Sequence, residues 1–200
     1  MATWMSHFRI AEYFLDKLEN ISEIEFIVGN IGPDCGEPNS DWSEFTPPRE
    51  ITHWRNERSE FGVDLDGFYN QYLAEPNRYF SFYLGYYIHL LADIEWEKQI
   101  SCPKINKFKS EFEKNKHFIW DMKKDWYDLD HLFLKEHPTF KVFLVFSMID
   151  EFPNKYLDYY SDTAIIRQIK FITNFYKNYS GDLNREFIYL TKEEMDKYHK

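Results

Sequence analysis

The chain has 200 residues, of which 24 are basic and 34 acidic, and its formal net charge is −10. This length suits a single domain over residues 1–200 with a hydrophobic core, to which the 20% of aromatic residues can contribute. The negative charge disfavours stable binding to nucleic acid or to an anionic membrane surface. It fits bound divalent cations, although a charge of this size also favours solubility by itself.

The sequence indicates a cytoplasmic location. Residues 1–7 lack the basic and apolar regions of a signal peptide, and no apolar run approaches the roughly 20 residues of a transmembrane helix. Cys35 and Cys102 are therefore expected as free thiols in a reducing compartment. No pattern indicates an oligomeric state.

Apolar residues follow a helical spacing through most of the chain. The longest such segment, residues 79–100, is expected to stop near Pro103, and residues 104–116 are polar and expected to be exposed. Thr191 opens a last short helix with a capping-box pattern. The other expected helices cover residues 6–18, 64–74, 117–136, 139–151 and 163–179.

Residues 29–50 interrupt this pattern with a long loop rich in glycine and proline, and a loop of this length is usually functional or disordered. The short apolar runs 24–28 and 187–190 resemble strands. Because two such runs cannot make a sheet, we interpret them as buried helix or loop. The predicted fold class is all-α, a single-domain bundle of many helices.

His89 and Asp93 are the most informative residues of the segment 79–100. They stand four positions apart, so they project from one helical face about 40° apart. An imidazole and a carboxylate are ligands that Zn²⁺ accepts. The pair alone is also typical of a histidine satisfied within a core.

Further ligand types precede this pair in the chain. His7 lies in the first expected helix, Asp34 lies on a bend shaped by glycine and proline, and His53 follows Thr52. A rigid bend that holds a carboxylate opposite a helical His-x3-Asp pair can close a coordination sphere.

This arrangement resembles the zinc-dependent phospholipase C family, which belongs with the single-strand nucleases of the S1/P1 type. The resemblance spans roughly residues 1–136 and implies an all-α fold with a zinc cluster at the bottom of a cleft. Four pieces match, in chain order. They are an early histidine (His7), a Gly-x-x-x-Pro-Asp loop (Gly29, Pro33, Asp34), a Thr-His pair (Thr52, His53), and a Leu-Gly-x-x-x-His-x-x-x-Asp motif (Leu84, Gly85, His89, Asp93).

The resemblance also implies roles for these side chains. One zinc would be held by Asp34, His53, His89 and Asp93. Asp93 would bridge to another zinc held by His7. In secreted relatives the amine of an N-terminal tryptophan completes that second site, whereas here the tryptophan is Trp4, behind three residues.

The family's third zinc uses a histidine beyond the aspartate and a later His-x3-Glu pair, and both are absent here; Gln99 stands at the first of these positions. Glu97 is one candidate substitute. Asp121, Asp125 and Asp128 share one face of the segment 117–136, which could equally be a solvated face. Asp125 is the preferred candidate because it lies nearest the apolar side. The expected cofactor is Zn²⁺, one to three ions.

The chemistry implied is hydrolysis of a phosphoester, in a phospholipid or another phosphodiester, by metal-activated water. Asp34 is the candidate that orients or deprotonates this water, a role carried over from the family. The aromatic run 79–87 could line a substrate cleft, but it is more typical of a helix in a core. The alternative is a non-catalytic helical binding or structural module that keeps one stabilising metal ion.

Overall fold

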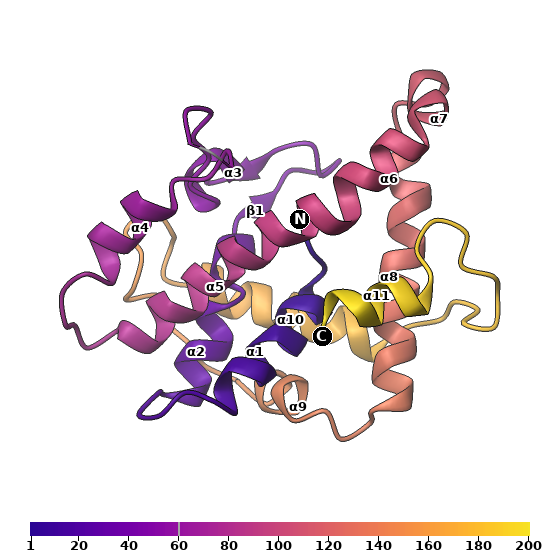
Figure 1. The fold of residues 1–200 in the computed structure, drawn as a ribbon. Coiled ribbons are helices and arrows are strands. Elements are labelled where there is room, and N and C mark those ends of the chain that lie inside the picture. Colours follow the sequence, from indigo (N-terminus) through magenta and orange to yellow (C-terminus); the bar gives the residue numbers. More distant parts are fainter. Residues whose placement is uncertain (60) are drawn as a thin grey trace.

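The computed structural model describes residues 1–59 and 61–200, which form an array of helices and one short two-stranded ribbon (Figure 1). The ribbon pairs β1 (Glu37–Pro38) with β2 (Phe45–Thr46) in antiparallel register. The all-α prediction is confirmed. The helices are α1 (Trp4–Leu15), α2 (Glu23–Gly29), α3 (Arg49–Thr52), α4 (Leu65–Tyr72), α5 (Phe80–Trp96), α6 (Cys102–Lys107), α7 (Lys109–Lys114), α8 (Phe118–Glu136), α9 (Lys141–Ser147), α10 (Ala164–Lys177) and α11 (Lys192–Tyr198), with a 3-10 turn η1 (Gly32–Asp34) and a π-helical turn η2 (Glu97–Ser101).

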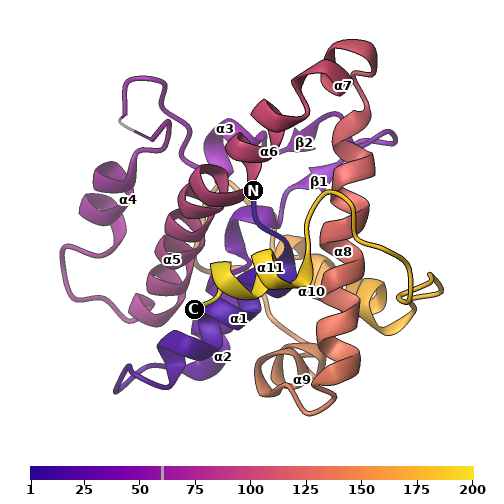
Figure 2. The same ribbon diagram turned by 45° about the vertical axis from the view of Figure 1, so that its right-hand side comes forward.

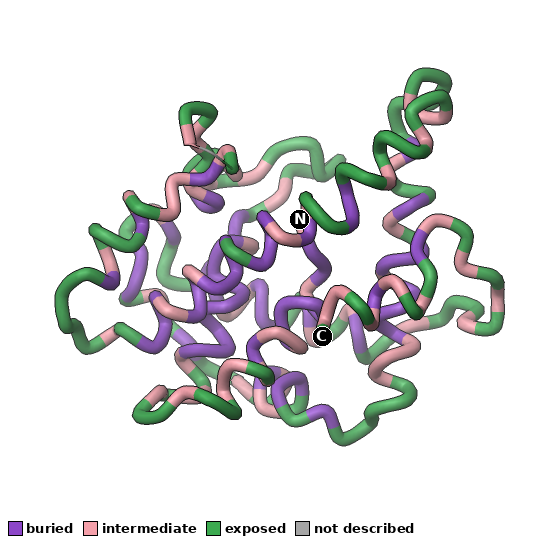
Figure 3. The backbone as a smooth tube through the Cα atoms, in the orientation of Figure 1, coloured by how far each residue is buried: buried purple, intermediate pink, exposed green. Residues whose placement is uncertain are grey.

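Helix α5 lies at the centre of the molecule, where most residues are buried (Figure 3). Its sequence is apolar nearly all round, as is typical of a helix packed on several sides. The segment 24–28 forms α2, a helix that packs against α5. Gly29 and Gly85 allow this close approach, because a Cβ atom on either would clash with the backbone of the opposite helix.

Helix α8 stands on the far side of the N-terminal segment from α5, and α6 and α7 connect the two (Figures 1 and 2). The hydrophobic residues form two clusters. The larger one surrounds α1, α2, α5 and α10, and the smaller one includes Trp96, Met122, Trp126 and Leu129. The chain's first residues run between these clusters, since Ala2 packs in the smaller and Met5 in the larger.

The expected ends of several helices are wrong; α1, for example, ends at Leu15 rather than at residue 18. The long helix does not stop at Pro103, because α5 passes through the π-helical turn η2 into α6. Pro103 occupies the first turn of α6, where its missing N–H is harmless. Helix α9 is shorter than predicted and ends at Ser147. The capping box at Thr191 is confirmed, with reciprocal hydrogen bonds to Glu194.

Within residues 1–59 and 61–200, none of the helices combines the length and apolar character needed to cross a membrane.

Candidate metal centre

Five side chains predicted from the sequence converge at the middle of α5. His89 and Asp93 project from α5 itself, and His7 comes from the neighbouring α1. Asp34 is the last residue of the turn η1, and His53 caps the C-terminus of α3. The loop 29–50 therefore supplies a ligand-type residue, as its glycines and prolines suggested.

The distances between these groups suit a metal ion. The Nε2 atom of His53 lies 3.4 Å from Asp34 Oδ1, and that of His7 lies 3.5 Å from Asp93 Oδ1. His89 Nε2 and His53 Nε2 lie 3.7 and 3.8 Å from Asp93 Oδ2. A tetrahedral zinc with bonds of about 2.0–2.1 Å holds neighbouring donor atoms about 3.4 Å apart. Small side-chain movements would therefore bring these atoms to coordinating distance.

The residues form two overlapping groups whose donor atoms lie within 4.8 Å of one another. One group is His7, His89 and Asp93, and the other is Asp34, His53 and His89. The rings of His7 and His89 are parallel and stacked, with centroids 3.7 Å apart. Both groups draw on His89, so the arrangement is one continuous cluster.

Several donor atoms of this cluster are buried and have no hydrogen-bond partner among the described residues. These atoms are both ring nitrogens of His7, Nε2 of His53, Nε2 of His89 and Oδ2 of Asp93. An unsatisfied buried polar group costs about 1–3 kcal/mol. Lone pairs from imidazole and carboxylate that meet at one point fit a bound divalent cation, so this donor set suits zinc.

Neighbouring groups hold the ligand-type side chains in orientation. His89 Nδ1 lies 2.8 Å from the carbonyl oxygen of Asn30, which fixes the proton on Nδ1 and leaves Nε2 free to bind metal. The indole N–H of Trp4 donates to Asp34 Oδ2 at 2.9 Å. Thr52 Oγ1 lies 3.0 Å from His53 Nδ1. Each of these contacts turns the remaining donor atom toward the cluster.

The protonation states also suit metal binding. Burial, together with the neighbouring His7, lowers the pKa of His89 to about 3, so this ring is neutral near pH 7. Burial acts to raise the pKa of Asp34, but the nearby imidazole of His53 outweighs this effect and lowers the pKa below its ordinary value. The pKa of Asp93 is lowered likewise: burial opposes the shift, while the N-terminal amino group and His7 outweigh it. Neutral imidazoles and ionised carboxylates are the forms that ligate zinc.

The N-terminal segment lies directly on the cluster. The backbone N–H of Ala2 donates to Asp93 Oδ1 at 2.7 Å, and Thr3 donates to Asp130 on α8 at 2.8 Å. Ala2 therefore binds at the cluster, and Thr3 anchors the segment to α8.

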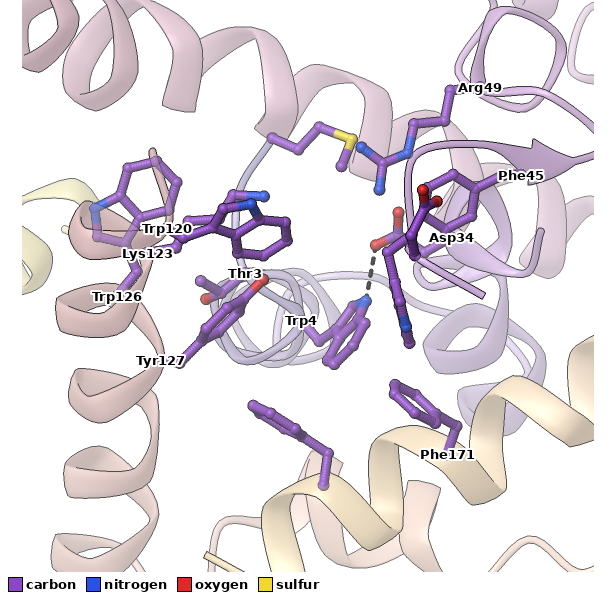
Figure 4. Close-up of a pocket in the computed structure, with 15 residues that line it drawn as sticks. Thr3, Trp4, Asp34, Phe45, Arg49, Trp120, Lys123, Trp126, Tyr127 and Phe171 are labelled. Atoms are coloured by element: carbon purple, nitrogen blue, oxygen red, sulfur yellow. Dashed lines mark hydrogen bonds between the residues drawn. The ribbon is translucent and has the colours of Figure 1, made fainter. Parts of the chain in front are cut away.

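An open pocket of about 460 Å³ adjoins the cluster, and Asp34 forms part of its wall (Figure 4). Trp4 and Thr3 lie along one side of it, and Phe171 of α10 lies beyond them (Figure 4). Residues of the aromatic run 79–87 do not line this pocket; Phe82, Tyr83 and Tyr86 pack in the core. Aromatic residues that the sequence did not single out line it instead: Trp42, Phe45, Trp120, Trp126, Tyr127, Phe171 and Phe175.

Asp125 does not join the cluster, and this part of the sequence prediction is corrected. Its carboxylate is 2.6 Å from the guanidinium of Arg185 and accepts the backbone N–H of Tyr189. Asp128 pairs with the same arginine at 2.6 Å. A cation already neutralises these carboxylates, so neither is free to hold a metal. Glu97, the other candidate substitute, lies 3.7 Å from Arg55.

An all-α chain with a buried His/Asp cluster beside an open pocket defines a class, the helical proteins with a centre that could hold a metal ion. The model of the family described as zinc dependent phospholipase C matches residues 6–187. The chain therefore belongs to the zinc-dependent phospholipase C family. This membership and the His/Asp groups support a zinc hydrolase in general. Comparisons with curated proteins and with solved structures found no match.

Proposed function

We propose that the protein is a zinc-dependent phosphoester hydrolase whose ligands are His7, Asp34, His53, His89 and Asp93. One observation supports the proposal most strongly. These five side chains meet beside an open pocket, and several of their buried donor atoms lie close together without hydrogen-bond partners among the described residues. Their number would be enough to hold two ions, since Asp93 faces His7 through Oδ1 and faces His89 and His53 through Oδ2.

Zinc in this position would polarise the phosphoryl group and make water nucleophilic near neutral pH. The chain itself contributes position and proton transfer. Trp4 holds Oδ2 of Asp34, while Oδ1 faces His53, and 12% of the Asp34 side chain is exposed. Asp34 therefore reaches both the cluster and the pocket, and we assign to it the orientation of the attacking water and the acceptance of its proton.

The proposal is tested with bis-p-nitrophenyl phosphate. We expect turnover that a chelator abolishes and Zn²⁺ restores. Asp34→Asn should lower kcat by about 10²–10⁴-fold, the usual contribution of a general base. Asp41→Asn is the matched control, because Asp41 lines the same pocket but is exposed and, among the described residues, is hydrogen-bonded only within its own turn.

Zinc content, measured on each variant, separates loss of the metal from loss of the base. If fully metallated protein turns over no phosphodiester, phosphomonoester or phospholipid, the hydrolase proposal fails. The alternative is then a helical module with one stabilising ion, which a stoichiometry of a single tightly bound zinc without turnover would favour.

A further inference from the structure

Two cationic side chains face the pocket from opposite walls. Arg49 comes from the first turn of α3, and Lys123 comes from α8 (Figure 4). Both also border a smaller adjoining pocket that reaches His53. They therefore flank the path between the cluster and the open pocket.

Neither cation has a carboxylate partner within residues 1–59 and 61–200. The guanidinium of Arg49 lies over the ring of Phe45 at 4.2 Å, and the ammonium of Lys123 lies over Trp120 at 4.8 Å. An aromatic face attracts a cation but does not neutralise it. By contrast, Arg185 on the far side of α8 has carboxylates at 2.6 Å.

Lys123 has lost much of its contact with water. Burial lowers its pKa, and the nearby charge of Arg49 lowers it further, against the opposite effect of Asp34 and Asp93. A desolvated cation beside a second cation is costly unless an anion joins them. The two carboxylates that partly offset this charge are those proposed as metal ligands, and bound zinc would remove that compensation.

On the basis of the proposed hydrolase function, we propose that Arg49 and Lys123 select a substrate whose phosphoryl group carries more negative charge than a phosphodiester, such as a phosphomonoester dianion. The aromatic walls would hold its apolar or aromatic leaving group. Aromatic walls also suit a quaternary ammonium headgroup of the choline type. Arg49 and Lys123 would repel such a group, and of the two carboxylates that line the pocket Asp34 is a proposed metal ligand and Asp41 is exposed. Arg49 and Lys123 would thus contact the substrate directly and determine its specificity.

The first test uses three esters that release the same p-nitrophenol and differ in charge: p-nitrophenyl phosphate, bis-p-nitrophenyl phosphate and p-nitrophenylphosphorylcholine. The wild-type chain should have its highest kcat/KM for the monoester and its lowest for the choline ester. Lys123→Met should raise KM for the monoester by about tenfold to a hundredfold, because one charge-assisted hydrogen bond to the phosphoryl group is lost. Its effect on kcat should be smaller. It should leave the choline ester unaffected.

Lys124→Met is the matched control, because Lys124 is the exposed neighbour that lies outside the pocket. It should change neither KM. Lys123→Glu should invert the preference and favour the choline ester. A wild-type preference for the choline ester, or equal effects of Lys123→Met and Lys124→Met, would overturn the proposal.

The second test measures binding without turnover. Calorimetry of the zinc-loaded chain with inorganic phosphate should show weaker binding by about tenfold or more in Lys123→Met and Arg49→Met, and no change in Lys124→Met. Equal phosphate affinity in all four proteins would refute the anion site. If no ester is turned over, the hydrolase proposal fails, while this binding measurement still decides the role of the two cations.

Discussion

The close packing of α2 against α5 should determine both the free energy of unfolding and the affinity of the centre for zinc. The substitution Gly85→Ala tests this expectation. A Cβ atom at Gly85 would lie 2.8 Å from the backbone nitrogen of Asn30 and closer still to the carbonyl oxygen of Phe26. Ordinary contacts begin near 3.5 Å, so the two helices must separate. Asn30 is the residue whose carbonyl holds His89, and its side-chain amide donates to the Gly85 carbonyl at 3.1 Å.

Three effects set the size of the change. Overpacking costs about 1–3 kcal/mol, and the loss of the Asn30 hydrogen bond costs about 1 kcal/mol. Replacing glycine by alanine within a helix contributes up to about 1 kcal/mol in the other direction. We therefore expect a loss of about 1–3 kcal/mol in the free energy of unfolding, together with weaker zinc binding because the His89 ring loses its orientation.

Urea unfolding followed by tryptophan fluorescence measures the first effect, and zinc titration measures the second. Leu91→Ala is the control, since Leu91 is exposed on the same helix. A Gly85→Ala protein within about 0.5 kcal/mol of wild type and with unchanged zinc affinity would refute the reasoning.

Three further predictions concern the centre and its surroundings. Zinc at about 100 times its Kd should raise the free energy of unfolding by about 2.7 kcal/mol, and an unchanged melting temperature would count against the site. Asp93→Asn should lose more zinc in elemental analysis than His7→Ala, because a bridging carboxylate supports two ions, whereas an equal loss of one ion would indicate a single site. Burial raises the pKa of Asp130 to about 7, against hydrogen bonds from Thr3 and Tyr176. Its folded pKa exceeds its unfolded value near 3.9, so its contribution to stability is complete below pH ~4 and is lost as the pH rises to about 7. Asp130→Asn should therefore gain stability over wild type as the pH rises from 5 to 8 in urea titrations, and parallel curves would contradict this.

The sequence predicted the elements that depend on local pattern. Apolar spacing located α8 and α10, and the pairing of Thr191 with Glu194 located α11. The sequence-based prediction failed where the conformation depends on structure beyond the local pattern. A proline normally ends a helix, but the π-helical turn before Pro103 shifts it into the first turn of a new one.

The same distinction applies to the candidate site. His89 and Asp93 could be paired from their spacing, and the resemblance to a family added His7, Asp34 and His53. Asp125 failed because its partner, Arg185, lies 60 residues later in the chain, and helical spacing carries no information about such a contact. Arg49 and Lys123 were missed for the same reason, since they come from α3 and α8 and meet only across the pocket.

Anomalous diffraction from crystals of the zinc-loaded chain, recorded at the zinc absorption edge, tests the proposed metal centre most directly. We expect at least one peak about 2.0–2.2 Å from donor atoms of His89 and Asp93, with further ligands from His7, Asp34 or His53. Zinc-loaded crystals whose anomalous peaks all lie away from these five side chains would contradict it.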